Sequence, residues 1–408
     1  MSIWYWAIAL LAVAAAVEVS AWHITRYFRR HCKWLITAAD LHPVIDPDGL
    51  QRFIDHGWDR ELGWTRKPNS EHAESAKGGG TSRYHIAADG ARANPGFKNS
   101  PPEILLYGDS YAFARQVNDN ETWAHVLSKS LNLNVSNRGV GNYGADQALL
   151  RLEREYDSHP APLVILAFVP ETIARVQCLW KHFGEHGNTL AFKPRFRLDP
   201  NGLDLLPNPI ERIEQFFDIP SLLPSLTAGD GLYRRKFAAD MLHFPYAWHL
   251  WRTRERSTAL IRAAWSDLRN GGDAVFTEVM RRNIDFAATL YRDAEACALL
   301  KAILIRFRDF ARTRRAIPLV VFLPQMMDLL RIRDQGHHYA GFVEDLSSEM
   351  AVLDLASSLL SIDDVSSLFV EDHYGGHYSP VGNRLVAERL AETCRNLLEP
   401  QPTLRSLA

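Results

Sequence analysis

Short apolar runs alternate with stretches of helical spacing along two parts of this 408-residue chain, and this alternation restricts the fold more than any other feature. The clearest run, residues 103–107, lies between a Pro-Pro pair and a Gly-Asp pair, as expected for a strand buried on both faces. Alternating strands and helices predict an α/β fold, in which a parallel sheet carries helices on both faces. The predicted strands are 103–107, 133–135, 163–169, 317–323 and 351–355, and the predicted helices are 121–131, 144–156, 283–313 and 380–398.

One long segment breaks this rhythm. Residues 178–285 contain turn-rich stretches and aromatic helical runs, which we interpret as a mostly helical insertion. The insertion could cover an active site or be a packing appendage, and the sequence leaves both readings open. The predicted organisation is therefore a membrane anchor with its basic flank (1–33), a lead-in region (34–100), the first part of the α/β core (101–177), the insertion (178–285) and the second part of the core (286–400).

The N-terminal segment has the length and composition of a membrane span. Residues 3–22 are apolar apart from Glu18 and Ser20, and about 20 helical residues cross the hydrocarbon core of a bilayer. Aromatic residues lie near both ends, and basic residues follow between positions 26 and 33. The positive-inside rule then predicts a single-pass anchor in the lipid bilayer with the rest of the chain on the cytoplasmic side. A cleaved signal peptide, a periplasmic location and an interfacial or soluble helix are the alternatives.

Charge and cysteine content exclude several classes of function. The formal net charge is −2, so no overall basic field exists to hold nucleic acid. The four cysteines are scattered without a Cys-x-x-Cys pair, which gives no support to a zinc ribbon or a redox dithiol. Neither a metal nor another cofactor is expected.

A serine follows the first predicted core strand at a position suited to catalysis. Ser110 lies three residues beyond Tyr107, and reacting groups in parallel sheets gather beyond the carboxyl ends of the strands. Gly108 allows a sharp turn there, after which the backbone N–H of Ser110 can point at an oxyanion. Ser110 is therefore a candidate nucleophile, and it needs a base within hydrogen-bond reach.

A histidine far along the chain is the candidate base. His377 lies in a polar, Gly-rich loop directly before the helix predicted at 380–398, for which Ser379 is a suitable N-cap. His373 is a rival base, and Asp372 could orient either imidazole. Ser110 and His377 together predict a serine hydrolase if the two segments meet at one edge of the sheet.

The two segments resemble the first and last blocks of the SGNH, or GDSL-type, hydrolases. The motif Gly108-Asp109-Ser110 matches the first block, and the loop containing His377 matches the last. The resemblance covers about residues 100–175 and 315–398, and the lead-in at 63–69 looks like that of membrane-anchored bacterial members. It implies a flavodoxin-like three-layer α/β/α sandwich, with Ser110 as nucleophile and His377 as base.

The last block departs from the family pattern at the acid. That pattern places an Asp three residues before the His, where this chain has Tyr374. Asp372 lies five residues before His377 and is the assigned third catalytic residue, while Asp363 and Asp364 are fallback candidates.

The same resemblance assigns the oxyanion donors. Residues 137–147 resemble the second block, which implies that the backbone N–H of Asn142 acts together with that of Ser110. The third block normally supplies an Asn side chain, but this chain has Pro-Glu-Thr at 170–172, so the hydroxyl of Thr172 is the candidate replacement. The loss of one such donor typically costs about 2.7–4 kcal/mol in the transition state.

These residues favour an ester hydrolase that cleaves an acyl or acetyl ester through a Ser-His(-Asp) acyl-enzyme mechanism. The expected substrate is an ester-bearing small molecule, lipid or glycan. One alternative is an O-acyltransferase that uses the same site on a sugar or lipid. The other is a catalytically weak, membrane-tethered binding module, which the missing Asn and the unusual Asp spacing would suit.

Overall fold

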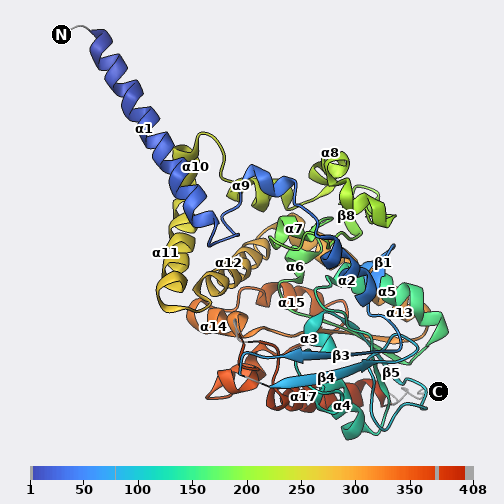
Figure 1. Ribbon diagram of the computed structural model, residues 1–408. Coiled ribbons are helices and arrows are strands. Elements are labelled where there is room, and N and C mark those ends of the chain that lie inside the picture. Colours follow the sequence, from blue (N-terminus) through green and yellow to red (C-terminus); the bar gives the residue numbers. More distant parts are fainter. Residues whose placement is uncertain (1–2, 79, 373–375, 400–408) are drawn as a thin grey trace. The chain divides into compact units, whose positions relative to one another are not determined.

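The computed structural model describes residues 3–78, 80–372 and 376–399 (Figure 1). The chain divides into two compact units. The sheet unit comprises Gln51–Gln177, Lys193–Asn208 and Ile284–Ala408. The helical unit comprises Met1–Leu50, Cys178–Phe192 and Pro209–Asn283. Within the segment predicted as an insertion, residues 193–208 therefore group with the sheet unit, while most of its helices group with the helical unit.

A five-stranded parallel sheet forms the centre of the sheet unit, and it confirms the predicted α/β fold class. The strand order is β11-β10-β7-β5-β6. Read from β6, with the five strands numbered along the chain, this order is 2-1-3-4-5. In this doubly wound order the chain switches direction between β5 and β7, and ligands bind beyond the carboxyl ends of the strands at that point. The strands are β5 (Ile104–Gly108), β6 (Val135–Asn137), β7 (Leu163–Phe168), β10 (Ile317–Phe322) and β11 (Ala351–Asp354).

Helices cover both faces of this sheet. On one face α4 (Trp123–Leu131) packs beside α17 (Pro380–Leu398). On the other, α5 (Ala145–Glu155) and α13 (Ala294–Thr313) contact each other and the strands β5, β7 and β10. The result is a three-layer α/β/α sandwich, because side chains of successive strand residues alternate between the two helical layers.

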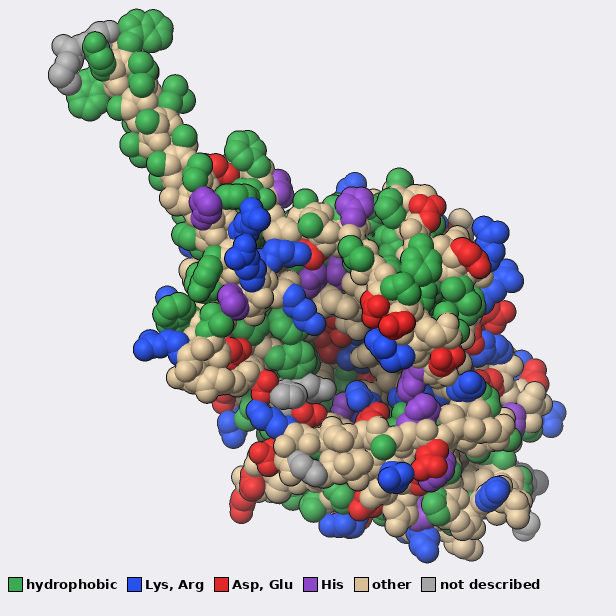
Figure 2. Space-filling view, in the orientation of Figure 1, with side chains coloured by type: hydrophobic (Ala, Val, Ile, Leu, Met, Phe, Trp, Pro, Cys, Tyr) green, Lys and Arg blue, Asp and Glu red, His purple; other side chains and the backbone are tan. Residues whose placement is uncertain are grey.

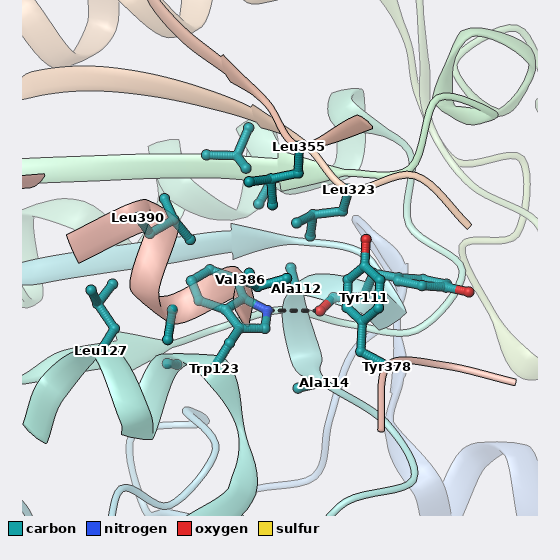
Figure 3. Close-up of a cluster of buried hydrophobic side chains, with 14 of the residues drawn as sticks. Tyr111, Ala112, Ala114, Trp123, Leu127, Leu323, Leu355, Tyr378, Val386 and Leu390 are labelled. Carbon is teal, nitrogen blue, oxygen red and sulfur yellow. Dashed lines mark hydrogen bonds between the residues drawn. The ribbon is translucent and has the colours of Figure 1, made fainter. Parts of the chain in front are cut away.

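The core between the sheet and α4/α17 is continuous and apolar (Figure 3). Trp123 and Leu127 of α4 meet Val386 and Leu390 of α17, and all four are fully buried. The indole N–H of Trp123 donates to the backbone oxygen of Tyr111 at 3.0 Å. That bond ties the layer of α4 to the turn that follows β5.

The segment predicted as one helix at 283–313 is two helices. α12 (Ala274–Leu290) ends before Asp293, whose side chain accepts a hydrogen bond from the N–H of Ala296 and so caps the start of α13. The apolar spacing continues across this break, which is why the sequence pattern did not reveal it.

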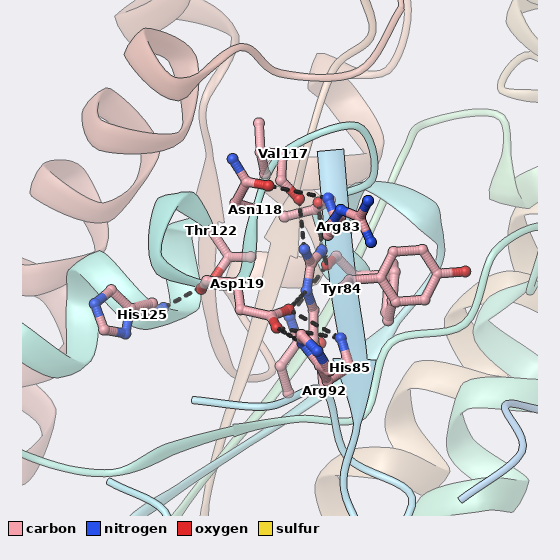
Figure 4. A network of polar contacts seen from close by, with 12 residues as sticks. Arg83, Tyr84, His85, Arg92, Val117, Asn118, Asp119, Thr122 and His125 are labelled. Carbon is pink, nitrogen blue, oxygen red and sulfur yellow. Dashed lines mark hydrogen bonds and ion pairs between the residues drawn. The ribbon is translucent and has the colours of Figure 1, made fainter. Parts of the chain in front are cut away.

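Two hairpins precede the sheet, and the segment that follows the second hairpin is tied to residues 113–119 by a buried ion pair (Figure 4). The hairpin strands are β1 (Trp58–Asp59) with β2 (Gly63–Trp64), and β3 (Ser70–Ser75) with β4 (Thr81–Ile86). Arg92, which is fully enclosed, pairs with Asp119 at 2.9 Å and donates to the carbonyl oxygens of Phe113, Ala114 and Val117. The pair therefore fixes the segment 113–117, which carries part of the site described below.

The helical unit contains the only helix in the described part of the chain that is long and apolar enough to cross a membrane, α1 (Ile3–Arg29). Hydrophobic side chains lie along its exposed surface (Figure 2). The carboxylate of Glu18 accepts hydrogen bonds from the backbone N–H groups of Tyr246 and Ala247, at the start of α10 (Tyr246–Arg252). Glu18 thus caps the N-terminus of α10, where the helix dipole favours a negative charge.

The remaining elements are short or belong largely to the helical unit. They are η1 (Ala38–Leu41), α2 (Pro47–Gly57), α3 (Ser110–Phe113), η2 (Asp119–Glu121), η3 (Tyr156–Ser158), α6 (Thr172–Arg175), α7 (Lys181–Gly184), β8 (Arg195–Asp199), β9 (Gly202–Leu206), η4 (Ile213–Phe217), α8 (Ile219–Gly229), η5 (Tyr233–Phe237), α9 (Ala238–Asp240), α11 (Arg254–Asn270), α14 (Met326–Gln335), α15 (Ala340–Ser347), α16 (Ala356–Leu360) and η6 (Val365–Leu368).

Candidate active site

The turn after β5 places Ser110 at the first position of the short helix α3. Gly108 has a φ of +155°, and a Cβ at this position would lie 1.7 Å from the carbonyl oxygen of Ala167, so no other residue fits. Asp109 caps α3 by accepting from the N–H of Tyr111 at 2.8 Å. The N–H of Ser110 donates to no group among residues 3–78, 80–372 and 376–399, and it is free to bind a substrate oxygen.

Asp109 holds the ends of two strands together. Its second oxygen accepts from the N–H of Val169, just beyond β7, at 2.9 Å, and lies 3.4 Å from the guanidinium of Arg175. Burial raises the pKa of the Asp109 carboxyl, and the charge of Arg175 acts against that rise. The carboxylate of Asp109 thus stabilises the turn that carries Ser110 and does not face the hydroxyl of Ser110.

The structure brings the predicted nucleophile and base together. The Oγ atom of Ser110 lies 2.8 Å from Nε2 of His377, although 267 residues separate them in sequence. His377 is only 4% exposed. Burial lowers the pKa of its imidazole well below 6.5, and the positive charges of Arg115 and Arg175 act in the same direction. The ring is therefore neutral at pH 7 and can accept a proton.

Gln116, which the sequence gave no reason to choose, lies on the other side of the imidazole. Its Oε1 atom is 2.9 Å from the backbone N of His377 and 3.0 Å from Nδ1 of the same residue. Two donors converge on this oxygen, so Nδ1 carries a proton and Nε2 accepts the hydrogen bond from Ser110. This tautomer is the one that general base catalysis requires.

Asp372 reaches the imidazole only through Gln116. Its carboxylate accepts a hydrogen bond from Nε2 of Gln116, and no contact joins it to His377. The predicted direct contact is thus replaced by an amide relay. The fallback candidate Asp364 caps the short helix η6 through the N–H of Ser366. The rival base His373 and Tyr374 lie outside the described residues.

Two tyrosines hold the histidine loop. The ring of Tyr111 lies 4.6 Å from that of His377, centroid to centroid, and its hydroxyl donates to the carbonyl oxygen of Gly376 at 2.9 Å. The hydroxyl of Tyr378 donates to the carbonyl oxygen of Pro324 at 2.8 Å. These contacts restrict the imidazole to the orientation that faces Ser110.

The predicted oxyanion segment lies against the nucleophile. A Cβ built on Gly141 would be 3.9 Å from that of Ser110. The carbonyl oxygen of Gly141 accepts from the indole N–H of Trp64 at 2.9 Å, and the N–H of the same trans peptide, that of Asn142, therefore points the opposite way. Asn142 has a φ of +68°, and its N–H donates to no described group. Its role as an oxyanion donor stays a prediction.

The hydroxyl of Thr172 has a structural contact. It is fully buried and accepts a hydrogen bond from the N–H of Ala145 at 2.9 Å, at the start of α5. Its neighbour Glu171 pairs with Arg175 at 3.1 Å. The proposed part of Thr172 in the oxyanion site stays a prediction.

No protein-family model matches the sequence, and no curated protein does. Solved structures do match. A putative lipolytic protein of the G-D-S-L family from Desulfitobacterium hafniense is 14% identical, over 71% of this chain and 97% of that one, with a TM-score of 0.32. A G-D-S-L lipolytic family member from Veillonella parvula is 11% identical over 71% and 96% of the two chains, also with a TM-score of 0.32. A lipase/acylhydrolase from Enterococcus faecalis is 12% identical over 74% and 98%, again at 0.32. Likenesses at this level do not establish an activity for this chain.

Proposed function

We propose that the protein is a serine ester hydrolase in which Ser110 is the nucleophile and His377 the general base. The observation that carries the proposal is the 2.8 Å distance between Oγ of Ser110 and Nε2 of a neutral His377. The pair lies beyond the carboxyl end of β5, at the switch point of the sheet, which is where α/β folds bind ligands.

The geometry supports a two-step acyl transfer. His377 removes the proton of Ser110 as Oγ attacks the ester carbonyl, and the carbonyl oxygen becomes an oxyanion bound by the free N–H groups of Ser110 and Asn142. The protonated imidazole then donates to the leaving alcohol, which leaves an acyl-enzyme. Water, deprotonated by the same imidazole, then attacks the acyl-enzyme. The tetrahedral intermediate that forms collapses, which releases the acid, and the imidazolium returns the proton to Oγ of Ser110.

An activity-based probe tests this assignment. A fluorophosphonate phosphonylates an activated serine, so we expect it to label the wild-type protein, with Ser110 as the modified residue in a peptide digest. Ser110→Ala is expected to lose the label and to lose hydrolysis of short para-nitrophenyl esters. Labelling that persists in Ser110→Ala would refute the assignment.

We further propose that α1 is a single-pass membrane anchor with its basic end on the cytoplasmic side. Support comes from its exposed apolar surface and from the basic residues of its last turn, Arg26 and Arg29. Glu18 is already engaged by α10, so removal of residues 3–16 leaves that contact in place. We expect full-length protein to stay in the membrane after carbonate extraction and the shortened protein to be soluble.

A mature N-terminus beyond residue 20 would show a cleaved signal peptide instead of an anchor. Digestion of the protein by protease added to intact cells would contradict its location on the cytoplasmic side.

A further inference from the structure

A buried arginine without an acidic partner lies close to the nucleophile. Arg66 follows β2 and is 7% exposed. Its Nη1 atom lies 2.5 Å from Nε2 of His56 and 2.9 Å from the hydroxyl of Tyr84. Its guanidinium also stacks over Phe113, at 4.5 Å from the ring centroid. No acidic group within the described ranges lies within ion-pair distance of Arg66.

Both hydrogen-bond partners of Arg66 are uncharged at neutral pH. Burial lowers the pKa of His56 to about 4, and the charge of Arg66 adds to the effect. Burial raises the pKa of Tyr84, which keeps its hydroxyl protonated. An arginine keeps its charge even when buried, and a buried charge without a counter-ion costs several kcal/mol. The fold therefore keeps an uncompensated cation at this position.

One nitrogen of the guanidinium is available to a ligand. Nε of Arg66 is buried and has no hydrogen-bond partner, and Nη2 has none either in the described part of the chain. Because Nε is enclosed, Nη2 is the donor that can reach a substrate, and a hydrogen bond from a charged guanidinium to a carboxylate oxygen is among the strong ones.

Nη2 of Arg66 borders the reaction site. A Cβ built on Gly141 would lie 3.5 Å from Nη2 of Arg66, 3.9 Å from Cβ of Ser110 and 4.0 Å from Cδ of Arg115. The nearest acid, Glu74, is engaged by Nε of Arg115 at 3.0 Å. The local balance of Arg66, Arg115 and Glu74 is thus one positive charge beside the nucleophile.

We propose that Arg66 binds a carboxylate carried by the substrate close to its scissile ester. The inference rests on the proposed ester hydrolysis and adds a substrate class to it: acidic esters, cleaved in preference to neutral esters of the same shape. A substrate carboxylate would be the counter-ion that Arg66 lacks among the described residues. Its binding there would also place the ester carbonyl near Ser110. If Arg66 acted instead as an oxyanion donor, it would serve acidic and neutral esters equally.

Pairs of esters that differ only in charge test the proposal. On the acyl side the pair is the para-nitrophenyl monoester of adipic acid and that of adipamic acid. On the alcohol side it is para-acetoxybenzoate and para-acetoxybenzamide. We expect kcat/KM of the wild type to be about 10- to 100-fold higher for the acid in at least one pair, as for a hydrogen bond to a charged group. The pair that shows the preference identifies the half of the substrate that carries the carboxylate. Equal kcat/KM within both pairs would overturn the proposal.

Variants then assign the preference to Arg66. Arg66→Gln is expected to remove it by lowering kcat/KM for the acid alone, and Arg66→Lys to restore part of it because the charge returns. Arg83→Gln is the matched control, since Arg83 is next to Tyr84 on β4 but is exposed and paired with Glu71. A loss of equal size for acidic and neutral esters in Arg66→Gln would overturn the proposal in favour of an oxyanion role.

Binding gives a readout that does not depend on turnover. Calorimetry with adipate is expected to detect binding by the wild-type protein and a loss of at least about 10-fold in affinity for Arg66→Gln, whereas adipamide is expected not to bind either protein. Equal adipate affinity in the two proteins, or none in either, would count against the inference. If adipate binds but no ester is cleaved in a Ser110-dependent way, the hydrolase proposal fails and the carboxylate site stands.

Discussion

Replacing Ser110 and His377 together is expected to lower kcat no further than replacing either residue alone. The reason is their single hydrogen bond of 2.8 Å, which makes the serine and the imidazole one catalytic unit. In such units the loss of one member removes nearly the whole contribution, and losses on the order of 10⁴- to 10⁶-fold are expected for each single variant and for the pair. The activity that remains would reflect binding and the oxyanion donors.

The measurement is kcat for a para-nitrophenyl ester with Ser110→Ala, His377→Ala and the double variant. Ser348→Ala is a suitable control, because Ser348 is exposed in the same unit and its hydroxyl bonds only to the carbonyl oxygen of Asp345. We expect this control to match the wild type. Losses that multiply in the double variant would mean that the two residues act independently, which contradicts the proposed mechanism.

The sheet was predictable because its strands are short, apolar and separated by clear turns. The run predicted at 163–169 is β7 (Leu163–Phe168), and that at 317–323 is β10 (Ile317–Phe322). The last helix begins as expected, with the hydroxyl of Ser379 accepting from the N–H of Gly382 at 3.2 Å. The grouping of the segments 193–208 and 209–283 into different units was not predictable, because it depends on contacts between distant parts of the chain.

The site was predictable only where a local motif marks it. Ser110 follows a strand within a Gly-Asp-Ser turn and His377 precedes a capped helix, and these local signals led to two residues that the fold places in contact. Gln116 carries no such signal. It reaches His377 because Ala114 and Gln116 both adopt left-handed backbone conformations, with φ of +58° and +66°, which few non-glycine residues do. No sequence motif marks Arg66 either. Its proposed role depends on the lack of an acidic partner among the described residues, which only the fold reveals.

Gln116→Ala is expected to lower kcat by about 10²- to 10³-fold, whereas Asp372→Asn is expected to lower it by less than about tenfold. In a Ser-His-Asp triad, loss of the group that orients the histidine costs about 10⁴-fold, because the imidazole takes the wrong tautomer. Here the oxygen that accepts from Nδ1 of His377 belongs to Gln116, and the carboxylate of Asp372 accepts from the amide of Gln116. The loss of Gln116 is therefore expected to lower kcat more than the loss of the acid Asp372, which is the reverse of the order in a Ser-His-Asp triad.

The pH dependence of kcat/KM separates a positioning role of Gln116 from a merely structural one. His377 must be neutral to act as a base, and its pKa lies well below 6.5, so the acid limb of the wild-type profile is expected below pH 6.5. Gln116→Glu keeps the acceptor and adds a negative charge next to Nδ1, which favours the imidazolium and raises its pKa. The acid limb should then move to higher pH in Gln116→Glu, with activity above that of Gln116→Ala, and should stay in place in Asp372→Asn. An acid limb that moves in Asp372→Asn but not in Gln116→Glu would show that the carboxylate of Asp372 acts on the imidazole directly, and the amide relay would be wrong.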